Sequence, residues 1–259
     1  MTINETKFIY ANENSDSHGV FMCSIGSPNT EHNDESSNLI MTKSANKMTW
    51  DYHGIDYTEP LQFKIVIAKL DGNFIDANDE RELKKWLCKD EFHWLQVDQN
   101  DLSNIWYSCI LTNPRKVNVG TMSGGLEFNV TCDSVQAWNK LSKKPYQTTN
   151  GSLTFRLNIT TDYDNYTIYP NWIITPTTNG TIRFTNNTTS EYMELTNCIA
   201  NEVITIDAMN DIIESSNGRV LLDNWNKIFL ELTQGTSNIT VTGNCKFEVQ
   251  YRLPVRVGG

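Results

Sequence analysis

Residues 76–132 include the clearest helical periodicity of apolar residues in the sequence. The rest of the sequence predicts short strands separated by turns. Leu83, Trp86 and Leu87 recur at i, i+3 and i+4, which places them on one face of a helix. Asp79 is predicted as the N-cap, and acidic residues in the first turn suit the positive end of the helix dipole. Because a helix of about two or three turns is not stable alone in water, this one must pack on a sheet.

Three strand-like runs that follow the helix predict this sheet, at residues 93–97, 106–111 and 126–132. In the last run, apolar residues from Leu126 to Cys132 alternate with polar ones, so one side of the strand is predicted to be buried. The segment 120–125 lacks the pattern of a nucleophile elbow because Thr121 replaces the expected residue, and it is interpreted as a loop.

The residues before the helix also favour strands. Residues 61–67 alternate between apolar and polar side chains, and residues 49–57 predict an aromatic-rich strand or hairpin arm. Residues 26–38 are almost entirely polar and predict an exposed loop. Residues 1–139 are therefore predicted to form an N-terminal domain, either a β-sandwich or a split barrel, with one short helix.

The second half predicts a separate domain. Residues 140–152 combine a basic cluster, a proline and a glycine turn, which is typical of a domain junction. Residues 153–259 show short strands without helical period, and this pattern predicts an antiparallel β-sandwich. The expected strands are residues 153–159, 172–175, 181–185, 192–195, 203–207, 220–222, 228–232, 239–242 and 245–253.

Composition excludes several classes of protein. A net charge of −10 and a pI near 4.9 argue against binding to nucleic acids or to anionic membranes. No apolar run approaches the ~18 residues of a membrane span, and the N-terminus lacks the pattern of a secretory signal. The six cysteines are interpreted as buried free thiols, with one or two disulfides as the open alternative.

The sequence contains no recognisable catalytic constellation. None of its four histidines has a second ligand at zinc spacing, so no catalytic, cofactor or metal site is expected, and the chain is predicted not to be an enzyme. Aromatic residues of the second half could stack on sugar rings, or they could be ordinary residues of a sandwich core and rim. The exposed-looking rings are Tyr163, Tyr166, Tyr169, Trp172 and Trp225, and the candidates for glycan stacking among them are Tyr163, Tyr166, Trp172 and Trp225.

Several features, taken in order, resemble a known family. The helix ends in Trp86-Leu87, an aromatic pair follows at Trp106-Tyr107, and the alternating strand ends in Thr-Cys-Asp at residues 131–133. In the second half the matching features are Tyr169-Pro170, the strand 182–186 ending in asparagine, a Glu-x-x-x-Ile-Asp segment at 202–207 preceded by Asn201, a glycine turn at 235–239 and Tyr251-Arg252. This order resembles the distal tail proteins of siphophages, which have glycine at the position of Asn201 and a glycine turn one residue shorter.

The resemblance implies a structural protein of the virion. In that family the first domain forms a ring, expected to be a hexamer, and the second is a galectin-like sandwich. The ring is a hub at the distal end of the tail that links the tail-tube protein to a tail-tip or tail-associated lysin protein, with a receptor-binding protein as a further partner. Assembly in the cytoplasm of the bacterial host is implied. The alternatives are a carbohydrate-binding adhesin that attaches the virion to its host, and a fragment of a secreted glycosidase.

Overall fold

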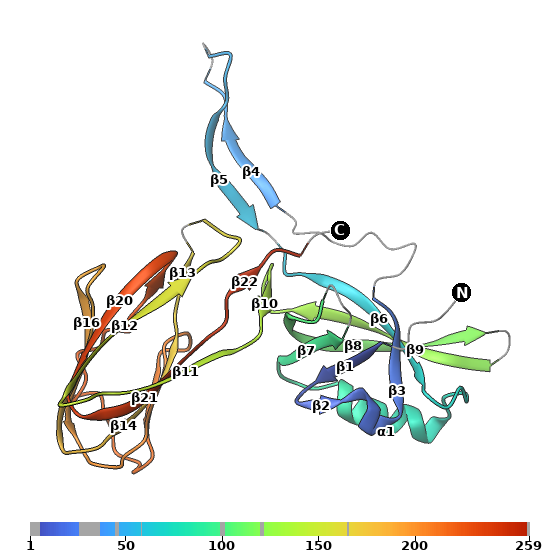
Figure 1. Cartoon of the computed structure of the whole chain (residues 1–259). Coiled ribbons are helices and arrows are strands. Elements are labelled where there is room, and N and C mark those ends of the chain that lie inside the picture. The colour runs from blue at the N-terminus through green and yellow to red at the C-terminus, as the bar shows by residue number, and fades with distance from the viewer. Residues whose placement is uncertain are drawn as a thin grey trace. The chain divides into compact units, whose positions relative to one another are not determined.

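The computed structural model describes residues 6–25, 37–44, 47–57, 59–98, 102–119, 122–164 and 166–257 (Figure 1). The chain divides into two compact units. Unit 1 contains the residues up to Asn139 and those from Val255 onward, and unit 2 runs from Lys140 to Pro254. Both consist mainly of antiparallel strands, which confirms the predicted fold class. No helix among the described residues is long and apolar enough to cross a membrane.

Most strands of unit 1 form one antiparallel sheet. Among the described residues its order is β2-β1-β7-β8-β9-β6-β3, with β10 paired to β8 and to β22. These strands are β1 (Lys7–Tyr10), β2 (Glu13–Asn14), β3 (Val20–Ile25), β6 (Gln62–Lys69), β7 (His93–Asp98), β8 (Ile105–Val119), β9 (Met122–Cys132), β10 (Ala137–Asn139) and β22 (Pro254–Val255). A separate hairpin contains β4 (Ser37–Thr42) and β5 (Asp51–Tyr57), and a short 3-10 helix, η1 (Ser15–His18), precedes β3.

The sheet of unit 1 curls back on itself. Met22 of β3, at one end of the strand order, donates its backbone N–H to the carbonyl of Thr6 beside β1, over 2.8 Å. This contact brings the far edge of the sheet next to β1. Of the two predicted architectures for residues 1–139, the structure therefore matches the split barrel with a helix.

The helix α1 (Ala77–Leu87) closes the core of this sheet, and its predicted apolar face is confirmed. Leu83, Trp86 and Leu87 are all buried, and Trp86 donates its indole N–H to the carbonyl of Tyr10 over 3.1 Å. The Trp86 ring is stacked with the His18 ring, with centroids 3.8 Å apart, and with the Phe8 ring at 5.4 Å. Burial of this one indole thus joins the helix to β1 and η1.

The predicted start of the helix was wrong by three residues. Asp76 is the N-cap, and its carboxylate accepts hydrogen bonds from the backbone N–H groups of Asn78 and Asp79. Asp79 accepts in return from the N–H of Asp76, which completes a reciprocal capping box. Two aspartates at this spacing can each satisfy the N-cap pattern, so local sequence alone did not choose between them.

Replacing Trp86 with alanine is expected to lower the free energy of unfolding by about 3–5 kcal/mol, because a buried indole is lost and a cavity remains. Urea unfolding followed by circular dichroism measures this change. Lys85→Ala is the control on the exposed side of the same helix, where an exposed ion pair with Glu82 contributes at most about 1 kcal/mol. Equal stability of Trp86→Ala and the wild-type protein would contradict the assigned helix face.

Unit 2 is an antiparallel sandwich, as predicted. Its two main sheets have the orders β11-β21-β14-β17-β18 and β12-β20-β15-β16. Trp172 and Phe247 from the first sheet meet Phe184 from the second, with ring centroids 5.0 and 5.2 Å from that of Phe184. The strands are β11 (Ser142–Gln147), β12 (Ser152–Ile159), β13 (Thr167–Ile168), β14 (Asn171–Pro176), β15 (Gly180–Asn186), β16 (Glu191–Cys198), β17 (Ile204–Asp207), β18 (Ile212–Ser215), β19 (Leu232–Thr233), β20 (Gly235–Thr242) and β21 (Cys245–Tyr251).

Four predicted segments of this half differ in the structure. The junction at 140–152 contains β11, which pairs with β21 along its whole length. Residues 235–239 are not a turn but the start of β20, paired with β12. Residues 220–222 and 228–231 are irregular rather than strands, although Leu221 and Leu230 are buried in the core. In these segments, apolar side chains on irregular backbone fill the core of the sandwich. The spacing of apolar residues in the sequence cannot distinguish such a segment from a buried strand.

Independent folding of unit 2 stays a prediction, and the place of β11 makes it testable. A fragment of residues 140–254 is expected to unfold cooperatively, whereas a fragment that begins at residue 153 is expected to be much less stable. The shorter fragment leaves the edge of β21 unpaired and lacks Tyr146, whose ring packs at 4.2 Å on Phe155 and at 5.3 Å on Phe247. Thermal unfolding of both fragments measures the difference. Equal melting temperatures would show that β11 is dispensable.

Candidate functional site

The hairpin of β4 and β5, which we call the arm, exposes an unusual amount of apolar surface. Its strands pair with each other and, among the described residues, with no other strand (Figure 1). Successive side chains of a strand point to opposite faces, and the neighbours Leu39, Ile40 and Met41 are all exposed, so neither face is covered by the rest of the described chain. Six large apolar side chains of the arm expose 43% or more of their surface: Leu39, Ile40, Met41, Met48, Trp50 and Tyr52.

Polar contacts within the arm are local and solvent-exposed. His53 and Thr42 share a hydrogen bond of 2.6 Å across the strands, and Lys47 forms an ion pair with Asp51 at 3.0 Å. Exposed contacts of this kind contribute little stability, and an isolated two-stranded hairpin is at best marginally stable in water. Large exposed apolar patches mark contact sites for other macromolecules. The arm therefore has the properties of a surface that is buried in an assembly.

The β8–β9 hairpin provides a second surface, the hairpin extension, formed by Thr112–Val119 of β8 and Met122–Gly125 of β9. β7 pairs with β8 only as far as Cys109, and β6 pairs with β9 only from Leu126 onward. Beyond these points, and leaving aside Gly125, which lies against β6, the described residues of the two strands form strand pairs only with each other (Figure 1). Unpaired strand edges are templates for strands of another chain. The segment 120–125 is thus not simply a loop, because Met122–Gly125 belong to β9.

Two contacts fix the base of the hairpin extension. Lys116 forms an ion pair of 3.0 Å with Glu80 on α1, which ties β8 to the helix. Gly125 lies so close to β6 that a Cβ atom there would be 2.6 Å from the carbonyl oxygen of Ile67. Glycine is therefore required at position 125 for close packing against β6. The glycine-rich sequence of this segment did not reveal that requirement.

The predicted glycan-stacking residues do not form an exposed platform. Trp172 is fully buried between the sheets, and Tyr163 and Trp225 are 8% and 9% exposed. Tyr166 is partly buried against the same core. The prediction of exposed stacking rings is therefore wrong for Tyr163, Trp172 and Trp225, which are buried in the sandwich as the alternative interpretation of these residues held. Glycan stacking by Tyr166 stays a prediction. Among the described residues, no group of three or more His, Cys, Asp or Glu side chains could hold a metal ion.

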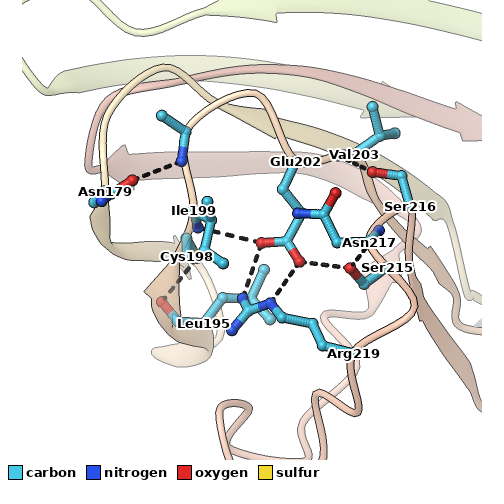
Figure 2. Close-up of polar contacts among 11 residues, drawn as sticks. Asn179, Leu195, Cys198, Ile199, Glu202, Val203, Ser215, Ser216, Asn217 and Arg219 are labelled. Atoms are coloured by element: carbon cyan, nitrogen blue, oxygen red, sulfur yellow. Dashed lines mark hydrogen bonds and ion pairs between the residues drawn. The ribbon is translucent and has the colours of Figure 1, made fainter.

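Figure 2 shows a buried ion pair in the segment that resembles the Glu-x-x-x-Ile-Asp motif. The Glu202 side chain is fully buried and accepts two hydrogen bonds from the Arg219 guanidinium, of 2.6 and 2.8 Å. It also accepts from the Ser215 hydroxyl at 2.5 Å and from the backbone N–H of Ile199 at 3.2 Å. The hydrogen bonds from Arg219 are the main cause that lowers the pKa of Glu202 below its ordinary value. One carboxylate thus joins the turn after β16 to the hairpin of β17 and β18.

Other residues of the resemblance also have structural roles. Asn201 has a φ of +64°, a left-handed conformation that glycine and asparagine adopt most readily. Asp207 accepts hydrogen bonds from the backbone N–H groups of Met209 and Asn210, and so stabilises the turn after β17. Asn186 is completely buried and donates to the carbonyl of Glu231 over 3.3 Å. These motif residues hold turns and loops rather than forming a reactive site.

Two protein-family models match this chain. A family model described as the N-terminal domain of phage tail proteins matches residues 3–134, and a second, described as a phage tail C-terminal domain, matches residues 136–251. The chain belongs to this family of phage tail proteins. No curated protein matched the sequence. Membership in this family indicates a structural component of the tail, located in the virion.

Solved structures show the same fold. The Dit protein of phage SPP1, described as a paradigm of the hub adsorption apparatus in phages that infect Gram-positive bacteria, has a TM-score of 0.63 at 8% identity, with 96% of this chain and 99% of that chain covered. A chain of the phage P2 baseplate in its activated conformation with Ca has a TM-score of 0.58 at 10% identity, covering 96% and 98%. The same baseplate with Sr gives 0.56 at 9%, covering 95% and 97%. The resemblance to distal tail proteins is thereby confirmed at the level of fold.

Glu202→Gln is expected to destabilise unit 2 by roughly 2–4 kcal/mol at pH 7, because a buried charge-assisted pair is lost and Arg219 keeps an uncompensated charge. The folded pKa of Glu202 is depressed, so its contribution is present above the unfolded pKa of about 4.3 and is lost as pH falls through the folded pKa. The difference between variant and wild type should therefore shrink from pH 7 to pH 3, as measured by urea unfolding. Glu194→Gln removes a more exposed pair with Arg183 and is the control. A difference that does not depend on pH would contradict this role.

Proposed function

We propose that the protein forms a closed ring at the distal end of a phage tail and acts as the hub between tail tube and tail tip. Six subunits are expected, as the resemblance implies. The tail-tube protein contacts one side of the ring and a tail-tip or tail-associated lysin protein the other, with a receptor-binding protein as a further partner. Assembly takes place in the cytoplasm of the bacterial host. Membership in the tail family and a fold shared with SPP1 Dit over nearly the whole chain support this proposal.

The arm is the observation that carries the proposal. A ring needs a heterologous interface, in which one surface of a subunit meets a different surface of the next. Unit 1 offers two such surfaces, the apolar arm and the unpaired edges of the hairpin extension. A subunit that docks its arm on the next one buries side chains that water otherwise surrounds. The same contact repeated around an axis uses every arm, which explains why an isolated hairpin is retained.

Residues 26–38, which the sequence predicts as an exposed loop, are a further candidate for this interface. Residues 26–36 lie outside the described residues, and β4 begins at Ser37. The candidate interface therefore rests on the arm and the hairpin extension. The galectin-like character of unit 2 stays a prediction of the resemblance.

The adhesin alternative is not favoured by a specific observation. It depended on exposed aromatic side chains in the second half, and three of the four candidates are at most 9% exposed. A stacking platform needs an accessible ring face. We therefore advance the ring as the one function for this chain.

The double substitution Leu39→Asp with Met41→Asp is expected to prevent ring formation without destabilising the subunit. Burial of the new carboxylates should weaken association by more than about 3 kcal/mol, roughly a hundredfold. Neither side chain belongs to the core of unit 1, so the melting temperature should not change. Light scattering on concentrated protein and negative-stain microscopy with the tube protein present measure assembly.

Val220→Asp is the control, because Val220 is 75% exposed in unit 2 and the substitution again replaces an exposed apolar side chain with aspartate. This variant should assemble like the wild type. A wild-type protein that stays monomeric both when concentrated and with the tube protein would refute the hub. If the arm variant forms normal rings, the ring stands and the arm is not its contact.

A further inference from the structure

Cys109 of β8 and Cys132 of β9 lie directly opposite each other in the sheet of unit 1. The hydrogen bond next to the pair runs from the N–H of Asp133 to the carbonyl of Ser108, over 3.0 Å, while the N–H of Cys132 turns away to Leu61 on its other side. In an antiparallel ladder this pattern makes the cysteines a non-hydrogen-bonded pair, in which the Cα atoms are about 4.5 Å apart and the side chains are closest. Disulfides span Cα distances of about 4.4–6.8 Å. The backbone therefore already places the two thiols within bonding range.

All six cysteines are described and all are free thiols. The interpretation of buried thiols holds for four of them and is wrong for Cys23, which is exposed, and Cys88, which is half-buried. Cys109 and Cys132 are 0% and 2% exposed and belong to the core of unit 1, whereas Cys23 is exposed. Burial raises the pKa of Cys132 to about 12 and also raises that of Cys109. Because the thiolate is the form that attacks disulfides, both groups react slowly while the sheet is closed.

We propose that Cys109 and Cys132 are a reversible disulfide site that clamps the register of the β8–β9 hairpin. The oxidant is a small-molecule disulfide. The thiolate of one cysteine attacks it and releases one small thiol, which leaves a mixed disulfide on the protein. The second cysteine, after losing its proton, attacks this mixed disulfide and releases the second small thiol. The protein loses two hydrogens and two electrons, and the small disulfide is reduced to two thiols.

The hairpin has a physical need for such a clamp. The pairing of β8 with β9 shifts register twice, between Thr112 and Arg115 and between Val117 and Asn118. Bulges of this kind interrupt the ladder, and register is weakly specified in glycine-rich strands, such as the start of β9 with Gly124 and Gly125. Both register shifts lie farther along the β8–β9 hairpin than the pair of Cys109 and Cys132. A covalent bond at this pair fixes the register from which the hairpin extension begins.

The point at which Cys109 and Cys132 would meet an oxidant rests on the proposed function. A tail protein that is assembled in a reducing host cytoplasm passes into an oxidising medium when the virion is released. The clamp is then formed after assembly. An excess of a small thiol reverses both exchange steps and returns the two free cysteines.

The test uses the full chain, incubated with glutathione disulfide at pH 8.5, where more thiolate is present than at pH 7. After free thiols are alkylated, trypsin releases residues 90–115 and residues 117–140, and each of these peptides contains one cysteine. Mass spectrometry is expected to find the two peptides joined, and to find them separate after treatment with dithiothreitol. The melting temperature should rise on oxidation and return on reduction.

Cys132→Ala is expected to abolish the linked peptides and the shift in melting temperature, while Cys23→Ser should change neither. The proposal is overturned if both peptides of the oxidised wild type are alkylated, or if each carries glutathione alone. It is equally overturned if Cys109 or Cys132 links to a different cysteine, since six cysteines allow fifteen pairings. None of these readouts depends on ring formation, so the failure of the hub and the failure of the clamp are distinguishable.

Discussion

The pairing of β8 with β9 is the interaction on which unit 1 depends. These strands form the middle of the sheet, with β7 on one side and β6 on the other, and they carry the buried row from Leu126 to Cys132 that lies in its core. The helix α1 would not be stable without this sheet, because a short amphipathic helix needs a surface on which to bury its apolar face. The same two strands continue beyond their neighbours as the hairpin extension. One pair of strands therefore builds the core and also presents an unpaired edge.

Unit 1 combines this closed core with an open arm, and the contrast has a physical meaning. Phe8, Trp86 and Phe128 are buried, whereas Trp50 and Tyr52 of the arm are more than half exposed. A monomer gains nothing from such side chains in water, since their apolar area is stabilising only when it is removed from solvent. In the proposed ring, copies of the chain and other tail proteins would cover this area. The exposed apolar surface of the arm is therefore better understood as interface than as a defect of the fold.

Unit 2 holds its loops with a buried ion pair. Buried ion pairs are weak contributors to stability when compared with apolar packing, but removal of one partner is costly. Glu202 satisfies both of its carboxylate oxygens with Arg219, Ser215 and the N–H of Ile199, so the turn after β16 and the β17–β18 hairpin are held in one arrangement. Asn201 and Asp207 add the backbone conformation and the turn contact on either side. The motif that resembles the tail family thus encodes a loop geometry.

The sequence by itself determined the elements that depend on local periodicity. The apolar face of α1, the alternation in β9 and the sandwich of unit 2 follow from side-chain spacing, and an ordered series of weak motifs was enough to indicate the tail family. It did not determine the exposure of single aromatic residues, because Trp172 and Trp50 have the same chemistry and only the sheets around Trp172 bury it. β4 was also missed: its short apolar run, Leu39 to Met41, was a signal, but its meaning depended on a partner strand. The facing of Cys109 and Cys132, the role of β11 and the exposure of the arm were decided by the tertiary structure, since strand register and burial arise from contacts between residues that are distant in the chain.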